Sequence, residues 1–255
     1  MTVYFIGAGP GDPELLTLKA AKRIAACPVC LYAGSLVPEA VVAGAPEGAR
    51  VLDTAPMTLE ETHGEILAAQ RKGQDVARVH SGDPSLYGAI AEQIRLLRRD
   101  GIDYEIIPGV PAYTAAAAAL GQELTIPEVA QSIVLTRMSM KSTGMPQHET
   151  LTNFAKSRTT IAIHLAIRNL REIERQLIPE YGADCPVAVI YRASWPDELI
   201  LRGTLGDIRE KVRTAKITRT ALILVGPALG EVTDFKDSAL YDPREEHILR
   251  VKKGA

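Results

Sequence analysis

Cysteine, aromatic residues and long apolar runs are all scarce in this sequence. Of its 255 residues, three are cysteine, one is tryptophan and three are phenylalanine. No apolar run approaches the roughly 18–20 residues that a membrane-spanning helix needs. The N-terminus lacks a basic segment followed by a long apolar stretch, so no signal peptide is predicted. We therefore expect a cytoplasmic protein that does not enter a membrane.

An excess of charge of either sign is also absent. The 29 lysines and arginines nearly balance the 31 aspartates and glutamates, which leaves a formal net charge of −2. No overall basic field attracts nucleic acid, and we expect no nucleic-acid partner. A hydrophobic content of 46% and a mean hydropathy of +0.02 are typical of a globular protein. The length allows one large domain or two of roughly 120 residues each.

The cysteines give little sign of redox chemistry. Cys27 and Cys30 form the segment CPVC, which has the spacing of a redox motif. In a thioredoxin-like protein that motif follows a strand and opens a helix, whereas here it follows a helical pattern. The preferred interpretation is that both thiols pack in a core, with a redox site as the alternative.

The first half of the chain alternates apolar runs with helical patterns, which favours a parallel, doubly wound sheet. Asp12 and Pro13 are placed to cap and begin the first helix. Strands are predicted over 3–9, 28–34, 49–55, 75–84 and 103–110, and helices over 14–26, 59–73 and 89–101.

The rhythm breaks at PGVPAYTAAAAALG, where two prolines precede an alanine-rich helix. Beyond it, two strand patterns separated by SWPDE suggest a hairpin and hence a mixed sheet. We predict an α/β domain over 1–112, a second α/β domain over 113–235 and a charged tail over 236–255. Strands of the second domain are predicted over 132–138, 159–166, 185–193, 198–205 and 220–229.

A glycine-rich loop, GAGPGDP, follows the first predicted strand. The dinucleotide-binding fingerprint G-x-G-x-x-G needs a third glycine where this chain has Asp12, whose charge would repel a pyrophosphate. A P-loop is excluded because no Gly-Lys-Ser/Thr follows. The loop therefore indicates close approach of the backbone to something other than phosphates.

The Gly-Asp-Pro unit occurs a second time, in HSGDPSLYG, which also follows a strand and precedes a helix. Taken alone, each copy is a good turn and helix cap. Two such turns at the carboxyl ends of strands in one parallel sheet predict a shared crevice lined by backbone.

Five segments together resemble the tetrapyrrole (corrin/porphyrin) methylase family. They are GAGPGDPELLTLKAA, HSGDPSLYG, PGVPAYTAAAAALG, LTR at 135–137 and YRASWPDE at 191–198, in that family's order. The resemblance implies two α/β domains, with S-adenosylmethionine bound in the cleft between them, and a homodimer. Within the family, the segments YAGSLV, LTR and YRASWPDE are most similar to members that methylate C11 of a precorrin during vitamin B12 assembly.

The resemblance also implies where the methyl donor and its product S-adenosylhomocysteine bind. Most of these residues are small or apolar, which suits a donor held largely by main-chain hydrogen bonds. The implied donor contacts are Pro10, Ser81, Gly82, Asp83, Leu86, Pro111, Ala112, His164, Leu165, Arg192, Ala193, Thr220, Ala221 and Leu222.

The implied acceptor is a tetrapyrrole that carries many carboxylates, so cationic side chains are expected at its site. Arg137 ends a strand in the family's TR motif, and Lys141 lies in the polar loop that follows. Gly9 and Gly11 line the acceptor's side of the first loop by resemblance.

The catalytic group is left open by the sequence. Asp12, Asp83, Glu198 and His80 are conceivable bases, but the two aspartates suit helix caps equally well. No metal is predicted, because the histidines and cysteines lack ligand spacing.

Three alternatives remain at this point. The acceptor could contain cobalt, or be a different position of a tetrapyrrole. A nicotinamide-dependent oxidoreductase is disfavoured by Asp12. A non-catalytic tetrapyrrole carrier would bind the ring without turnover.

Overall fold

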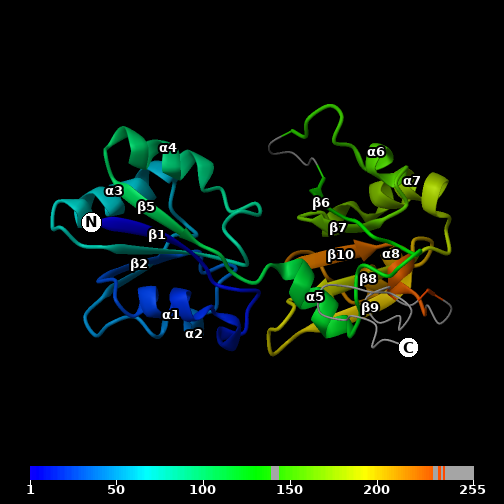
Figure 1. Cartoon of the computed structure of the whole chain (residues 1–255), viewed down its shortest axis with the longest axis horizontal. Helices are drawn as coiled ribbons and strands as arrows, with labels where there is room; N and C mark the ends of the chain where they lie inside the picture. The colour runs from blue at the N-terminus through cyan, green and yellow to red at the C-terminus, as the bar shows by residue number, and fades with distance from the viewer. Residues whose placement is uncertain (139–143, 232–234, 237, 239–255) are drawn as a thin grey trace, which may run out of the picture. The chain divides into compact units, whose positions relative to one another are not determined.

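The computed structural model describes residues 1–138, 144–231, 235–236 and 238. The described chain forms two compact α/β units (Figure 1). Unit 1 comprises Met1–Leu120 together with Tyr191–Leu199, and unit 2 comprises Gly121–Ile190 and the chain from Ile200 onward. The predicted boundary at 112/113 lies at the start of a helix that belongs to unit 1. Within the described residues, no helix is both long and apolar enough to cross a membrane.

Unit 1 contains the predicted parallel sheet. Its five strands follow the order β3-β2-β4-β1-β5, and each neighbouring pair is parallel. The predicted parallel sheet is therefore confirmed. The strands are β1 (Thr2–Gly7), β2 (Val29–Tyr32), β3 (Arg50–Asp53), β4 (Val76–His80) and β5 (Asp103–Ile107).

Helices cover both faces of this sheet, as the continuous burial of β1, β2 and β4 requires. The first face packs against α1 (Leu18–Ile24) and α2 (Glu39–Val42), and the other against α3 (Leu59–Gln70) and α4 (Ala91–Arg99). Figure 1 shows these two layers on opposite sides of the sheet. The neighbouring strands β1 and β4 thus lead into helices on opposite faces. In open α/β sheets this arrangement opens a crevice at the carboxyl ends of the two strands.

The predicted helix over 14–26 is instead broken into two pieces. A 3-10 turn, η1 (Pro13–Leu15), ends at Leu16, whose extended backbone (φ −65°, ψ 138°) separates it from α1. Thr17 then begins α1 by accepting a hydrogen bond from the Ala20 amide. Asp12 does cap the segment it precedes, but that segment is η1 and not α1. The four-residue helix α2 was not predicted, because it is too short to show a periodic pattern.

The chain leaves the first sheet through α5 (Ala112–Leu120), the predicted alanine-rich helix. The sheet of unit 2 has the order β6-β7-β10-β8-β9 and is mixed, as predicted, since β6 runs parallel and β10 antiparallel to β7. Its strands are β6 (Ile133–Arg137), β7 (Thr160–His164), β8 (Pro186–Tyr191), β9 (Leu199–Thr204) and β10 (Ala221–Val225), and its helices are α6 (Leu151–Ala155), α7 (Leu170–Tyr181) and α8 (Ile208–Thr214), with 3-10 turns η2 (Ile167–Asn169) and η3 (Pro227–Leu229).

Packing, not redox chemistry, explains the CPVC segment. Cys27 and Cys30 are free and buried in the core between the sheet and α1. Burial raises the pKa of Cys27 to about 12 and that of Cys30 to about 11. A reactive redox thiol needs a lowered pKa and partial exposure, so the structure supports core packing for both thiols.

Candidate functional site

Three loops of unit 1 meet at the carboxyl ends of β1, β4 and β5. Gly9 of the first loop and Gly82 of the second form an antiparallel bridge. The Gly82 amide donates to the Gly9 carbonyl at 2.7 Å, and the Gly9 amide donates to the Gly82 carbonyl at 3.2 Å. The two Gly-Asp-Pro turns therefore lie side by side, at the strand pair where the fold opens its crevice.

Glycine is required where the third loop, which follows β5 and contains Gly109, meets the loops of Gly9 and Gly82. A Cβ atom on Gly109 would lie 2.2 Å from the Gly82 carbonyl oxygen, and a Cβ atom on Gly7 would lie 2.4 Å from the Gly109 amide nitrogen. Both separations are well inside van der Waals contact, so only glycine lets these backbones approach so closely. The wall of the crevice is consequently made of main chain.

Asp83 ties the second loop to the third. Its Oδ2 accepts a hydrogen bond from the Gly109 amide at 2.9 Å, and its Oδ1 accepts from the Ser85 amide at 2.8 Å and from the Ser85 hydroxyl. Partial burial acts to raise the pKa of Asp83, but these hydrogen bonds outweigh it and hold the pKa below its ordinary value. Asp83 is therefore a fixed anion that organises backbone, which is the capping role and a poor starting point for a general base.

The start of α5 adds main-chain donors beside Gly82. A Cβ atom on Gly82 would lie 3.8 Å from the Cα atom of Pro111 and 3.9 Å from the Ala112 amide nitrogen. The first amides of a helix have no partner inside the helix and favour negatively charged groups. This corner of the crevice suits a carboxylate.

The segment Tyr191–Leu199 belongs to unit 1 and packs against the first loop. Trp195 Nε1 donates to the Pro10 carbonyl at 2.9 Å, and the Asp12 amide donates to Ser194 Oγ at 3.0 Å. A Cβ atom on Gly11 would lie 2.2 Å from the Trp195 ring, so the indole occupies the space that a side chain would need. Trp195 therefore belongs to the wall of the first loop.

Arg192 is held at the edge of this segment. Its guanidinium lies 4.4 Å from the centroid of the Trp195 ring, and its Nη1 pairs with Asp197 at 2.7 Å. The stacking and the ion pair fix a cation next to the first loop. Ala193, its neighbour, is buried.

The predicted site residues of unit 2 gather at one end of its sheet. Arg137 and His164 are register partners at the carboxyl ends of β6 and β7. Because β10 runs antiparallel to β7, with Ile223 opposite Ile163, its first residues Ala221 and Leu222 lie at this same end. Burial lowers the pKa of His164 to about 4, so it is neutral at physiological pH and suits a wall contact.

Left-handed backbone occurs repeatedly in the predicted segments. Tyr87, Ala89, Leu165, Arg192 and Thr220 have φ angles between 48° and 56° although none is glycine. Such conformations cost on the order of 1–3 kcal/mol and cluster at ligand sites. Of the nine non-glycine residues with positive φ among the described residues, Leu165, Arg192 and Thr220 are ones that the family resemblance singles out.

The structure thus brings the predicted residues into two groups, one in each unit. Of the predicted set, Lys141 lies outside the described residues. Unit 1 holds Gly9, Pro10, Gly11, Ser81, Gly82, Asp83, Leu86, Pro111, Ala112, Arg192 and Ala193; unit 2 holds Arg137, His164, Leu165, Thr220, Ala221 and Leu222.

Two of the remaining conceivable bases, Asp12 and Glu198, also have structural partners. Asp12 Oδ1 accepts from the Glu14 amide at 2.9 Å, and Glu198 Oε2 accepts from the Ser194 amide at 2.7 Å. Burial, followed by the nearby positive charge of Arg78, lowers the pKa of His80 to about 3. Among the described residues, no cluster of three or more histidine, cysteine or carboxylate side chains has the arrangement of a metal site.

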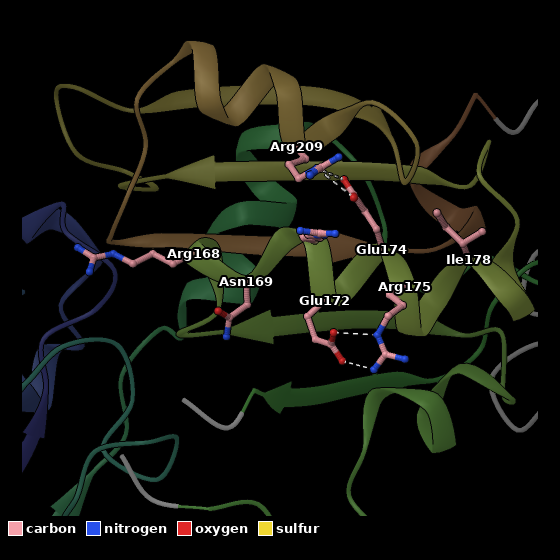
Figure 2. Close-up of a pocket in the computed structure, with 8 residues that line it drawn as sticks. Arg168, Asn169, Glu172, Glu174, Arg175, Ile178 and Arg209 are labelled. Carbon is pink, nitrogen blue, oxygen red and sulfur yellow. Dashed lines mark hydrogen bonds and ion pairs between the residues drawn. The ribbon is translucent and has the colours of Figure 1, made fainter. Parts of the chain in front are cut away.

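A separate hollow of about 560 Å³ lies on unit 2 (Figure 2). Both of its carboxylates are already paired, Glu172 with Arg175 and Glu174 with Arg209. It is lined mostly by charged side chains of η2, α7 and α8, and no predicted site residue contributes to it. The hollow is a solvent-exposed helix surface with ion pairs, and it is not the candidate functional site.

Unit 1 is an open α/β fold in which glycine-containing loops meet at the carboxyl ends of its strands, the place where such folds bind ligands. Sequence comparison identifies the family. The model of the Tetrapyrrole (Corrin/Porphyrin) Methylases matches residues 2–209, and the chain belongs to that family. It is 55% identical to the precorrin-4 C(11)-methyltransferase of a Sinorhizobium species, over 98% of both chains. It is 57% identical to the enzyme of the same name from Pseudomonas aeruginosa, over 98% of this chain and 99% of the relative.

Solved structures give the same fold. A cobalt precorrin-4 methyltransferase superimposes with a TM-score of 0.87 at 46% identity, covering 90% of this chain and 96% of that chain. A uroporphyrin-III C-methyltransferase from Thermus thermophilus, solved in complex with S-adenosyl homocysteine, gives a TM-score of 0.75 at 30% identity and covers 90% of this chain and 99% of that one. The predicted fold class and family are confirmed.

Proposed function

We propose that this protein transfers a methyl group from S-adenosylmethionine to C11 of precorrin-4, giving precorrin-5, in the assembly of the corrin ring of cobalamin. The observation that carries the proposal is the identity of 52–57% to several precorrin-4 C(11)-methyltransferases over nearly the whole chain. The proposal includes a homodimer located in the cytoplasm.

The loops at the carboxyl ends of β1, β4 and β5 are the part of unit 1 that we propose to contact the methyl donor. S-adenosylmethionine, when bound, supplies a methyl group on a sulfonium, whose departure leaves a neutral thioether. The proposed contacts to the donor's polar groups are the main chain around Gly82 and the first amides of α5. Their proximity, and the hydrogen bond from the Gly109 amide to Asp83, support this proposal. His164 and Leu165 in unit 2, with Thr220 to Leu222, keep the role of donor contacts that the resemblance gives them.

The protein's contribution to the reaction is alignment and exclusion of water. The C11 position of the acceptor belongs to an electron-rich system that is already nucleophilic. Holding two reactants in line supplies effective molarities of about 10⁵–10⁸ M, so no strong base is needed to start the step. Arg137, at the end of β6, and Lys141 are proposed to pair with carboxylates of the acceptor.

One incubation tests the proposal. The purified protein is given S-adenosylmethionine with enzymatically prepared precorrin-4 and, in a parallel reaction, with its cobalt complex. Mass spectrometry and carbon NMR are expected to show one added methyl group at C11 of the metal-free substrate. The second candidate function is methylation of cobalt-precorrin-4, because two cobalt-precorrin-4 C(11)-methyltransferases are 46% and 47% identical to this chain. Methylation of the cobalt complex alone would favour it. Tetrapyrrole binding without methyl transfer to either substrate would contradict both.

A further inference from the structure

A buried arginine in β4 has no carboxylate partner among the residues that the structure describes. Arg78 is 7% exposed, and among the ion pairs of the described residues none involves it. Its Nη1 donates to the Leu31 carbonyl at 3.3 Å and its Nε donates to Gln93 Oε1 at 3.0 Å. Burying a guanidinium without an opposite charge is costly, so this arrangement needs an explanation beyond packing.

Gln93 connects this arginine to the second site loop. Gln93 lies on α4, is 7% exposed, and donates from Nε2 to the Ala89 carbonyl at 2.9 Å. A glutamate at position 93 would neutralise Arg78 better, but a carboxylate has no hydrogen to donate to Ala89. An amide is the side chain that accepts from Arg78 and donates to the loop at once.

The loop that Gln93 holds is strained and anchored at both ends. Asp83 fixes its beginning through Ser85 and Gly109. Near its end, Tyr87 and Ala89 have φ angles of 56° and 50°, in a region that costs alanine and tyrosine energy. A contact at the Ala89 carbonyl is therefore placed where the loop would otherwise relax.

We propose that Arg78 and Gln93 are positioning residues, a buried relay that holds the strained end of the 83–89 loop in the shape that binds the methyl donor. Arg78 orients the Gln93 amide, and the amide holds the Ala89 carbonyl. This inference rests on the proposed function, because that function makes the loop part of the donor site. Neither residue contacts the reacting groups.

The variant Gln93→Glu separates positioning from stability. The new carboxylate pairs with Arg78, so the melting temperature is expected to stay equal or rise. The carboxylate loses the hydrogen bond to Ala89 and repels its carbonyl, so the dissociation constant for S-adenosylhomocysteine, measured by calorimetry, is expected to rise about tenfold or more. Under steady-state conditions, the KM for S-adenosylmethionine rises more than kcat falls. The control is Gln70→Glu, the same chemical change on α3, which should leave S-adenosylhomocysteine binding unchanged.

A second substitution tests the strain itself. Glycine adopts positive φ at no steric cost. The double variant Gln93→Glu with Ala89→Gly is therefore expected to recover part of the lost affinity. Unchanged affinity in Gln93→Glu would overturn the relay, as would a fall in melting temperature that accounts for the weaker binding. Failure of the unaltered protein to bind S-adenosylhomocysteine would instead overturn the proposed function.

Discussion

Single atoms decide whether the three loops of unit 1 can meet. Gly7, Gly82 and Gly109 approach through their backbones, and a methyl group on either Gly7 or Gly109 would occupy space already filled by main chain. Main-chain atoms cannot rotate out of the way as a long side chain does. The two Gly-Asp-Pro copies allowed this convergence to be predicted from the sequence, because parallel strands bring their carboxyl ends together. The part played by Gly109 was missed, since a Pro-Gly pair by itself indicates only a turn.

Gly109→Ala is expected to separate the loops. The free energy of unfolding should fall by about 1–3 kcal/mol, as for other overpacked sites. Affinity for S-adenosylhomocysteine should fall by at least about tenfold, because the Asp83 contact to the Gly109 amide is displaced. Urea denaturation and calorimetry measure the two effects.

Gly64→Ala is the matched control. Gly64 is exposed in the middle of α3, and a Cβ atom there would meet nothing within 4 Å. The same substitution should therefore raise the free energy of unfolding by about 0.5–1 kcal/mol through helix propensity and leave ligand affinity unchanged. Equal effects of the two substitutions would contradict the close approach of the loops.

At the scale of elements, the strands were more predictable than the contacts between loops. The central strands β1, β2 and β4 are buried, as expected for strands inside a covered parallel sheet, whereas the edge strands β3 and β5 are partly exposed. By contrast, the hydrogen bond from Trp195 to Pro10 joins residues 185 positions apart. No local pattern signals such a contact, so the sequence alone does not place Trp195 against the first loop. The Gln93 contact to Ala89 was missed for another reason: polar side chains on helices are usually exposed.

The elements α3 and α4 are joined by a carboxylate, which makes their packing sensitive to acid. Asp100, at the end of α4, accepts hydrogen bonds from Arg99 and from His63 of α3, the latter at 2.6 Å. These contacts, Arg99 first and then His63, hold the pKa of Asp100 well below its usual range. A carboxyl group with a lowered pKa in the folded state stabilises the fold above its unfolded pKa of about 4, and this contribution is lost as the pH falls below that value.

Asp100→Asn is therefore expected to lower the free energy of unfolding at pH 7, and the difference from the unaltered protein should shrink as the pH falls from about 4. Urea denaturation at pH 7 and at pH 3 measures this. Asp103→Asn, a change of an exposed carboxylate at the start of β5, serves as the control and should have little effect at either pH. A difference that stays constant between the two pH values would contradict the argument.

At the scale of the whole molecule, the cysteines report on each unit separately. Cys27 and Cys30 lie in unit 1 and Cys185 lies in unit 2, and all three are buried. Burial raises the pKa of Cys185 to about 11, so it shares the low reactivity of the other two. Each thiol should react with a disulfide reagent only when its own unit opens.

In native protein at pH 8, the thiols are expected to react at least about 10³-fold more slowly than in the urea-unfolded chain, given ordinary domain stabilities. The variant Cys185→Ala then reports the opening of unit 1 alone, and the double variant Cys27→Ala with Cys30→Ala reports unit 2. Because the glycine-walled crevice lies in unit 1, S-adenosylhomocysteine at 100 times its dissociation constant should slow the unit 1 thiols by up to about 100-fold. Rapid reaction of the folded protein would contradict the burial of these side chains. The unit 1 thiols could also react slowly at a rate that S-adenosylhomocysteine does not change. That result would show that their exposure does not require the crevice to open.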